Sequence, residues 1–288
     1  MKVNKKLKLL LKELEKIQVV TPVGGSGTRT IPLELLYLME EKGIDKGKLD
    51  APKPLYKVCG KTLLELFVDL YYSNGFRDFR FLLGKKNKPS TRMIENYIKN
   101  YIASKYDEIK IKLSYDPDVP KVGKGKAFKN ALIKGIIDKD KRSLFAFPDD
   151  LILHKWAPLE LLLRHDYNRK FGILVTVLLV PYTYSPYGIA EIEGHLIRRF
   201  REKPKINLYA STGVSVLEPD VYQYIVNLID LESERAQEIE NVVYPVLAEE
   251  GKIGYHLLPG GEGEVWIPIN NLKSWKKANA ICKNTKIC

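Results

Sequence analysis

Apolar segments of strand length alternate with longer segments of helical periodicity through residues 17–147. The strand-like segments are Ile17-Gln18-Val19-Val20, 79–83, 109–114 and 143–147, and the helical segments are 62–74, 91–104 and 126–137. This order favours a mostly parallel sheet covered by helices, in which ligands bind beyond the carboxyl ends of the strands. Functional residues are therefore expected in the acidic and glycine-rich turns that follow these strands.

The second half of the chain has a different pattern, with more strand-like segments. A helix is predicted near 157–165, and it leads into the very apolar segment 172–180. The alternating segments 189–192 and 196–200 flank Gly194, which predicts a β-hairpin. The remaining predicted elements are a strand at 213–217, helices at 219–230 and 238–249, and strands at 253–258 and 264–269. We therefore expect a smaller lobe built on the first half, with no linker long enough to separate independent domains.

Length and composition fit one large domain of a folded protein. The chain has 288 residues, of which 45% are hydrophobic and 28% are charged, as in globular proteins with a packed core. Its net charge of +12 suits an anionic ligand such as a nucleotide, a sugar phosphate, a nucleic acid or a membrane surface. The lysines are scattered over predicted helices and form no stripe of arginine and aromatic residues, so nucleic acid is not the expected partner.

Cysteines, histidines and apolar segments narrow the cellular context. The three cysteines, Cys59, Cys282 and Cys288, are too few and too widely spaced for a disulfide framework, and the four histidines lack the spacing of metal ligands. Charged residues interrupt the apolar positions near the N-terminus, and no later segment reaches the roughly 18 apolar residues of a membrane span. The sequence therefore predicts a cytoplasmic protein without a membrane segment.

The chain is expected to have three parts. Residues 1–16 are predicted to form an N-terminal amphipathic helix that packs on the domain or on a partner subunit, which leaves a homo-oligomer open. Residues 17–280 form the domain, with a nucleotide-binding part at 17–150 and a sugar-phosphate-binding part at 151–280. Residues 281–288 are expected to be a C-terminal tail.

A glycine-rich turn follows the first predicted strand. Its sequence is Gly24-Gly25-Ser26-Gly27-Thr28-Arg29. Glycines let a backbone turn sharply and present N–H groups to a phosphate, and an arginine adds a planar cationic fork for phosphate oxygens. A flexible loop would have the same composition, so the turn alone does not decide between the two interpretations.

An ordered set of motifs resembles the sugar-1-phosphate nucleotidylyltransferases. In the family's order they are the glycine-rich turn followed by Pro32, then Pro52-Lys53-Pro54-Leu55 with Gly60-Lys61, Gly123-Lys124-Gly125-Lys126-Ala127 with Ala131, Phe145-Ala146-Phe147-Pro148-Asp149-Asp150, Tyr187-Gly188, Glu202-Lys203-Pro204, Ser211-Thr212-Gly213-Val214, and Trp266 with Trp275. The set covers about residues 17–280 and is far more specific than any single motif. The resemblance implies a Rossmann-like three-layer α/β/α fold with a mostly parallel central sheet and a small β-rich sugar-binding lobe.

The reaction implied by the resemblance is the attack of a sugar 1-phosphate oxygen on the α-phosphorus of a nucleoside triphosphate, with release of pyrophosphate. Arg29 would hold the β- and γ-phosphates and Lys53, pinned between two prolines, would reach the α-phosphate. The triphosphate cradle and the base-contacting turn would be formed by Gly24, Gly25, Gly27, Thr28, Gly123 and Gly125.

The resemblance also implies a metal site and a sugar-phosphate site. Asp149 ends an apolar strand, where its carboxylate would bind Mg²⁺ held on the phosphates, while Asp150 is interpreted as a residue that caps the next turn. Glu202 would face the sugar hydroxyls and Lys203 the sugar phosphate, with Tyr187 and Gly188 in the same site. The Pro-Asp-Asp motif and the Gly-x-Gly turn resemble the uridylyltransferase branch of the family, which makes UDP-glucose, so UTP or dTTP with glucose 1-phosphate is the expected pair.

The largest departure from the family lies in its terminal motif. The family has an aspartate two residues after the tryptophan as a second Mg²⁺ ligand, but here Trp266 is followed by Pro268, which has no side-chain oxygen. Glu264 shares the strand face of position 268 but is about 13 Å away at about 3.3 Å per residue. Asn270 or Asn271 could offer a neutral oxygen instead.

Two smaller departures bear on the substrates. The stretch between Pro32 and Pro52 is longer than in the family and suggests an inserted helical turn and loop, which could close over the triphosphate or could equally have no role in function. The asparagine that the family has before its Gly-x-Tyr strand is replaced here by Ser211 or Thr212, which leaves the sugar undetermined.

Three functions follow from this pattern. The leading hypothesis is a nucleotidylyltransferase that makes a nucleotide sugar from a nucleoside triphosphate and a sugar 1-phosphate. The alternative is a catalytically silent homologue that binds nucleotide or sugar phosphate and has a regulatory or assembly role, and it is motivated by Pro268. The third is transfer to another phosphorylated acceptor, such as a polyol, choline or inositol phosphate.

Overall fold

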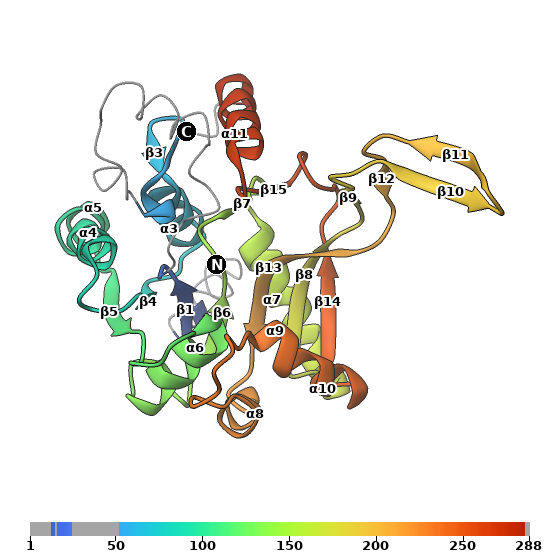
Figure 1. Ribbon diagram of the computed structural model, residues 1–288. Helices are drawn as coiled ribbons and strands as arrows, with labels where there is room; N and C mark the ends of the chain where they lie inside the picture. Colours follow the sequence, from blue (N-terminus) through green and yellow to red (C-terminus); the bar gives the residue numbers. More distant parts are fainter. Residues whose placement is uncertain (1–12, 15, 25–51, 286–288) are drawn as a thin grey trace, which may run out of the picture.

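A seven-stranded sheet forms the centre of the computed structural model, which describes residues 13, 14, 16–24 and 52–285. The strand order is β14-β8-β13-β6-β1-β4-β5 (Figure 1). These strands are β1 (Ile17–Pro22), β4 (Asp78–Leu83), β5 (Lys110–Tyr115), β6 (Arg142–Phe145), β8 (Val175–Val180), β13 (Ala210–Leu217) and β14 (Ile253–Leu257). Strand β13 runs antiparallel to both of its neighbours, and every other neighbouring pair is parallel. The predicted mostly parallel sheet is confirmed.

Helices cover both faces of this sheet, as the two largest groups of buried apolar residues show. Val19 of β1 packs on one face with side chains from α3 (Leu63–Ser73), α4 (Pro89–Tyr97) and α7 (Ala157–Asn168). The neighbouring Val20 packs on the other face with side chains from α6 (Gly123–Ile133), α8 (Val221–Leu228) and α10 (Tyr244–Glu249). Because successive strand residues point to opposite faces, a strand that is apolar throughout requires a helical layer on each side.

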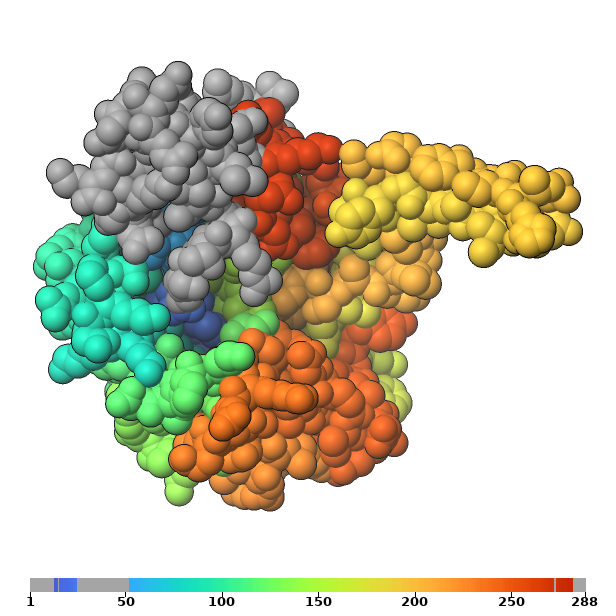
Figure 2. Space-filling view, in the orientation of Figure 1, coloured from blue at the N-terminus to red at the C-terminus, as the bar shows by residue number. Residues whose placement is uncertain are grey.

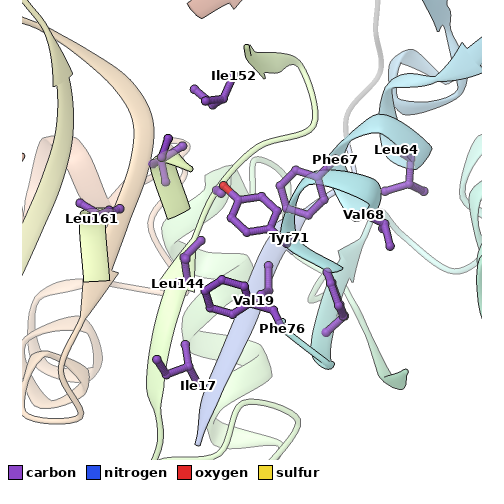
Figure 3. Close-up of a cluster of buried hydrophobic side chains, with 14 of the residues drawn as sticks. Ile17, Val19, Leu64, Phe67, Val68, Tyr71, Phe76, Leu144, Ile152 and Leu161 are labelled. Atoms are coloured by element: carbon purple, nitrogen blue, oxygen red, sulfur yellow. The ribbon is translucent and has the colours of Figure 1, made fainter. Parts of the chain in front are cut away.

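The first of these clusters is the larger. Figure 3 shows Phe67 and Tyr71 of α3 over Val19 and Leu144 of the sheet, with Phe76 beside Val19. Each of these five side chains is less than 9% exposed. Helix α3 begins cleanly because Thr62 accepts a hydrogen bond from the backbone of Glu65.

Several helix boundaries differ from those predicted. The segment predicted as one helix at 91–104 continues from α4 through a π-turn (Ile98–Ile102) into α5 (Ala103–Lys105). The predicted helix at 238–249 is broken into α9 (Ile239–Val242) and α10 at Val243, two residues before Pro245. Proline lacks the backbone N–H that a continuous helix needs, but it is tolerated in the first turn of a helix. Pro245 lies in the first turn of α10.

Short elements that periodicity did not reveal complete the structure. They are the 3-10 turns η2 (Lys53–Leu55) and η4 (Arg169–Phe171), the strands β2 (Lys57–Val58), β3 (Lys61–Thr62), β7 (Asp150–Ile152), β9 (Thr183–Tyr184) and β12 (Lys205–Ile206), and the helix α11 (Leu272–Thr285). The predicted start of the tail at residue 281 falls inside α11. Cys59, in the β2–β3 turn, is disulfide-bonded, which the cysteine spacing did not predict.

A β-hairpin projects from the smaller lobe. It consists of β10 (Ile189–Glu193) and β11 (Leu196–Arg201), joined by a turn in which Gly194 has a φ of 56°. Figures 1 and 2 show it extending well away from the body of the molecule. The predicted hairpin is confirmed, and all its strand residues are exposed.

Two sequence expectations fall partly or wholly beyond the described residues. Of the predicted N-terminal helix, only Glu13 and Leu14 are helical residues within the described part, and Leu14 is buried in the core. The long segment between Pro32 and Pro52 is outside the described residues except for Pro52 itself. No helix among the described residues is long and apolar enough to cross a membrane.

Candidate active site

The first turn of the site is anchored to the neighbouring strand. Gly24 follows β1, and its backbone N–H donates a hydrogen bond to the carbonyl of Leu82 at 3.1 Å. A Cβ at Gly24 would lie 2.4 Å from the backbone nitrogen of Gly84, so only glycine lets these two turns touch. The rest of the predicted phosphate cradle, Gly25, Gly27, Thr28 and Arg29, lies outside the described residues.

Lys53 and Asp149 meet at this edge of the sheet, although 96 positions separate them. The Lys53 Nζ donates a hydrogen bond to Asp149 Oδ2 at 2.5 Å and lies 3.4 Å from Asn270 Oδ1. Lys53 is held in η2, which begins after Pro52 and contains Pro54, so its backbone has little freedom. The structure therefore brings together the two residues that the sequence assigned to the α-phosphate and the metal.

Asp150 is more than the turn cap that the sequence analysis took it for. It begins β7, and its Oδ1 accepts a hydrogen bond from Trp266 Nε1 at 2.9 Å. Burial, together with the negative charge of Asp149, raises the pKa of Asp150 to about 7. A carboxyl group that titrates near neutral pH thus lies directly beside the carboxylate of Asp149, which faces Lys53.

Gly213 leaves room for Asp150. Its φ is 78°, and a Cβ there would lie 2.9 Å from Asp150 Oδ2 and 2.6 Å from the ring of Phe147. The ring of Phe147 in turn lies 4.0 Å from the Nζ of Lys124. A glycine in the family-like Ser211-Thr212-Gly213-Val214 segment is therefore required by the second aspartate, a role that its position in the sequence did not suggest.

The Gly-x-Gly turn at the start of α6 packs against a later loop. A Cβ at Gly123 would lie 2.5 Å from the carbonyl oxygen of Gln237, and the Gly125 N–H donates to that oxygen at 2.8 Å. Between them, Lys124 forms an ion pair with Glu240 at 2.5 Å. Both glycines thus allow close approach of the Gln237 backbone, and their contact with a nucleotide base stays a prediction.

The predicted sugar-phosphate residues lie together at the base of the projecting hairpin. A Cβ at Gly188 would be 2.9 Å from Glu202 Oε2, and Glu202 pairs with Lys203 at 3.2 Å. Tyr187 is 74% exposed. Among the described residues, no hydrogen bond or ion pair links this group to Asp149, so the structure forms two groups of site residues rather than one.

Pro268 lies where the missing carboxylate matters most. Strand β15 (Trp266–Pro268) pairs antiparallel with β7, with Pro268 opposite Asp150, and the N–H of Ile269 donates to the Asp149 carbonyl at 2.8 Å. Glu264 accepts from the Gly261 N–H instead, which agrees with its predicted exclusion from the site. Within the described ranges, no group of three acidic, histidine or cysteine side chains could hold a metal ion.

The oxygens that remain fit a hard divalent cation. Asp149 offers a carboxylate and Asn270 an amide oxygen, which are donor types that Mg²⁺ accepts beside water and phosphate oxygens. Both oxygens already face one positive charge, the ammonium group of Lys53. These protein oxygens are therefore suited to an Mg²⁺ ion that takes most of its ligands from phosphate groups and only a few from the protein.

Comparison with known proteins assigns the chain. The model of the nucleotidyl transferase family matches residues 48–284. The chain belongs to this family. The match confirms the resemblance that the ordered motifs suggested, and it spans the elements that carry Lys53, Asp149 and Asn270.

The family's members among the relatives differ in the nucleotide their names specify. The chain is 28% identical over 259 residues to the mannose-1-phosphate guanyltransferase beta-B of Xenopus laevis, covering 88% of this chain and 61% of that protein. It is 25% identical over 286 residues to the glucose-1-phosphate cytidylyltransferase of Salmonella typhi, covering 92% and 98%. The chain thus spans about three fifths of the first relative and nearly all of the second.

Solved structures share the fold. A structure described as a glucose-1-phosphate thymidylyltransferase from Bacillus anthracis has a TM-score of 0.65 at 19% identity, and the match covers 93% of this chain and 96% of that one. A UDP-glucose pyrophosphorylase in complex with UDP-glucose has a TM-score of 0.60 at 18% identity, covering 93% and 98%. The Rossmann-like nucleotidyltransferase fold predicted from the motifs is confirmed.

Proposed function

We propose that this protein transfers a nucleotidyl group from a nucleoside triphosphate to a sugar 1-phosphate and releases pyrophosphate. The observation that carries the proposal is the contact of Lys53 with Asp149 at the sheet edge where Gly24 begins the glycine-rich turn. Family membership and the names of the relatives support it.

The chemistry needs no protein nucleophile and no proton transfer. An ionised oxygen of the sugar phosphate forms a bond to the α-phosphorus, and the bond from that phosphorus to the bridging oxygen of pyrophosphate breaks, with its electrons leaving on pyrophosphate. The protein has to hold two polyanions in line and stabilise the charge that develops at the α-phosphorus. When bound, Mg²⁺ supplies part of that positive charge, and Asp149 would hold it.

Lys53 supplies the rest of the charge at the reacting phosphorus. In the free protein its ammonium group is neutralised by Asp149. When a triphosphate enters, we propose that Lys53 exchanges this carboxylate for an α-phosphate oxygen, which frees Asp149 for the cation. The side chain is only 17% exposed, so little water has to be removed from it at that step.

The base and the sugar are the finer part of the proposal. UTP or dTTP with glucose 1-phosphate is the first pair to test, because the Pro-Asp-Asp motif and the Gly-x-Gly turn favour it. The relatives include a guanyltransferase named for mannose 1-phosphate and a cytidylyltransferase named for glucose 1-phosphate. A panel of UTP, dTTP, CTP, GTP and ATP with both sugar phosphates therefore decides the pair.

The test is Mg²⁺-dependent pyrophosphate release with this panel. Lys53→Ala and Asp149→Ala are each expected to lower kcat by about 10²–10³-fold, as for loss of one group that stabilises transition-state charge. Lys57→Ala is the matched control, because Lys57 is an exposed lysine four positions along the same segment. Release by the wild type that is unchanged in the Asp149 variant would contradict the assigned site.

Pro268 favours a second candidate, a silent homologue that binds nucleotide without turnover. It predicts nucleotide binding by the wild type with no pyrophosphate release for any pair on the panel. Release by the wild type rules it out, and release only with another phosphorylated acceptor, such as a polyol, choline or inositol phosphate, identifies the third hypothesis.

A further inference from the structure

One face of strand β15 looks toward the aspartate pair. The side chain of Trp266 reaches Asp150 Oδ1, and side chains two positions apart share a strand face. Pro268 is the next residue on this face and lies opposite Asp150 in the β15–β7 register. Asn270 lies just beyond the end of β15, where the chain turns. Its side-chain oxygen is the nearest one that the chain offers after position 268.

Of the two asparagines after β15, only one faces the site. Asn270 Oδ1 lies 3.4 Å from Lys53 Nζ. Asn271 Oδ1 instead accepts a hydrogen bond from the Ser274 N–H at 2.9 Å, so it serves the first turn of α11. The backbone N–H of Asn270 is also held, since it lies 3.0 Å from the Pro268 carbonyl and 3.1 Å from Ser274 Oγ. Helix α11 thus fixes the backbone that presents Asn270.

We propose that Asn270 is the second protein ligand of the catalytic cation, in place of the carboxylate that Pro268 cannot provide. The inference rests on the proposed function and concerns this chain's own departure from its family. Lys53 marks the position, because its ammonium group lies between the carboxylate of Asp149 and the amide of Asn270. Asp149 and Asn270 would hold the cation through these two oxygens, and Lys53 would then face the phosphates.

The chemistry of the substitution predicts a weaker but intact site. An amide oxygen is a neutral ligand, and affinity for a hard cation falls with the number of charged ligands. The cation is therefore expected to bind weakly to the free protein and well only with a triphosphate. Loss of the amide oxygen should weaken binding by about tenfold, the lower end of the effect of removing partners around metal ligands.

Mn²⁺ binding measured by electron paramagnetic resonance tests this directly. The wild type and the variants Asn270→Leu and Asn270→Asp are titrated with Mn²⁺ beside α,β-methylene analogues of UTP, dTTP, CTP and GTP, in which the scissile bond is blocked. Leucine has nearly the shape of asparagine without its oxygen, and aspartate restores a carboxylate. Asn100→Leu on the exposed surface is the control, and thermal unfolding confirms that each variant is folded.

The expected result is about tenfold weaker Mn²⁺ binding in Asn270→Leu only, with binding in Asn270→Asp at least as tight as in the wild type. Equal Mn²⁺ affinity in the wild type and in a folded Asn270→Leu overturns the inference while leaving the proposed function intact. Absence of binding of any analogue to the wild type overturns the proposed function and the inference with it.

Discussion

The contact between Gly24 and Gly84 makes a quantitative prediction about the glycine-rich turn. In Gly24→Ala the new Cβ would lie 2.4 Å from Gly84 N and 2.8 Å from Gly84 Cα, whereas ordinary contacts begin at 3.4 Å. The two turns must therefore separate by about 1 Å, and both atoms that obstruct the methyl group belong to the backbone. Overpacking of this kind costs about 1–3 kcal/mol of unfolding free energy.

The same displacement acts on the nucleotide. A shift of about 1 Å at a group that positions a substrate lowers the rate by about 10²-fold. We expect Gly24→Ala to lose about 10²-fold in kcat/KM for pyrophosphate release, with the smaller loss of stability measured by urea unfolding. Activity is measured with the best nucleotide and sugar-phosphate pair of the panel.

Gly84→Ala is the matched control, since it alters the other side of the same contact. Its Cβ would meet the Thr91 hydroxyl at 2.9 Å but lies 3.7 Å from Gly24 Cα, so the side chain of Thr91 can yield and the turns stay together. This variant should keep kcat/KM within a few fold. Equal losses in both variants would refute the view that the Gly24 backbone contact sets the turn.

Two further predictions concern groups away from the aspartate pair. Burial raises the pKa of Asp116 from 3.8 to about 6. The folded state therefore keeps this proton to a higher pH than the unfolded state, and the free energy of unfolding of the wild type falls as the pH rises through this range. Urea unfolding should show the stability of Asp116→Asn rise relative to that of the wild type by about 3 kcal/mol from pH 4 to 6, and the difference should stay constant at higher pH. The hairpin exposes one apolar face formed by Ile192, Ile197 and Phe200, while Glu191 pairs with arginines on the other face. In a chain with a net charge of +12, this nearly neutral hairpin is the expected contact between two copies. Phe200→Glu should convert a dimer to a monomer in analytical ultracentrifugation, and a monomeric wild type would contradict this prediction.

The sheet and its main helices could be predicted from the sequence because buried strands and amphipathic helices have clear periodicity. Val19 and Val20 illustrate the reason, since adjacent apolar residues in β1 already imply a helical layer on each face. The break at Val243 could not be read from periodicity, because the apolar positions continue across it. Strands of two or three residues, such as β7 and β9, are too short to show any alternation.

Motifs fixed the positions of Lys53 and Asp149 in the sequence, and the structure places these two side chains in contact, while their roles stay predictions. What could not be predicted depends on contacts between distant segments. The indole of Trp266 on Asp150, and the packing of Gln237 on Gly123, join positions more than 100 residues apart. Asn270 and Asn271 are equivalent in the sequence, and two contacts separate them: Asn270 accepts a hydrogen bond from Lys53, and Asn271 accepts one from Ser274 at the start of α11.

The pairing of Lys53 with Asp149 also determines how loss of the carboxylate should divide between binding and turnover. In the wild type, a triphosphate must first compete with Asp149 for the ammonium group, and a partly exposed ion pair of this kind is worth up to about 1 kcal/mol. Asp149→Ala removes the competitor, so metal-free triphosphate should bind up to about fivefold more tightly in EDTA, by calorimetry. Turnover with Mg²⁺ should nevertheless fall, because the cation has lost its charged ligand. A parallel loss of metal-free binding and turnover would instead mean that Asp149 holds the fold of the site, and that Lys53 does not change partners during the reaction.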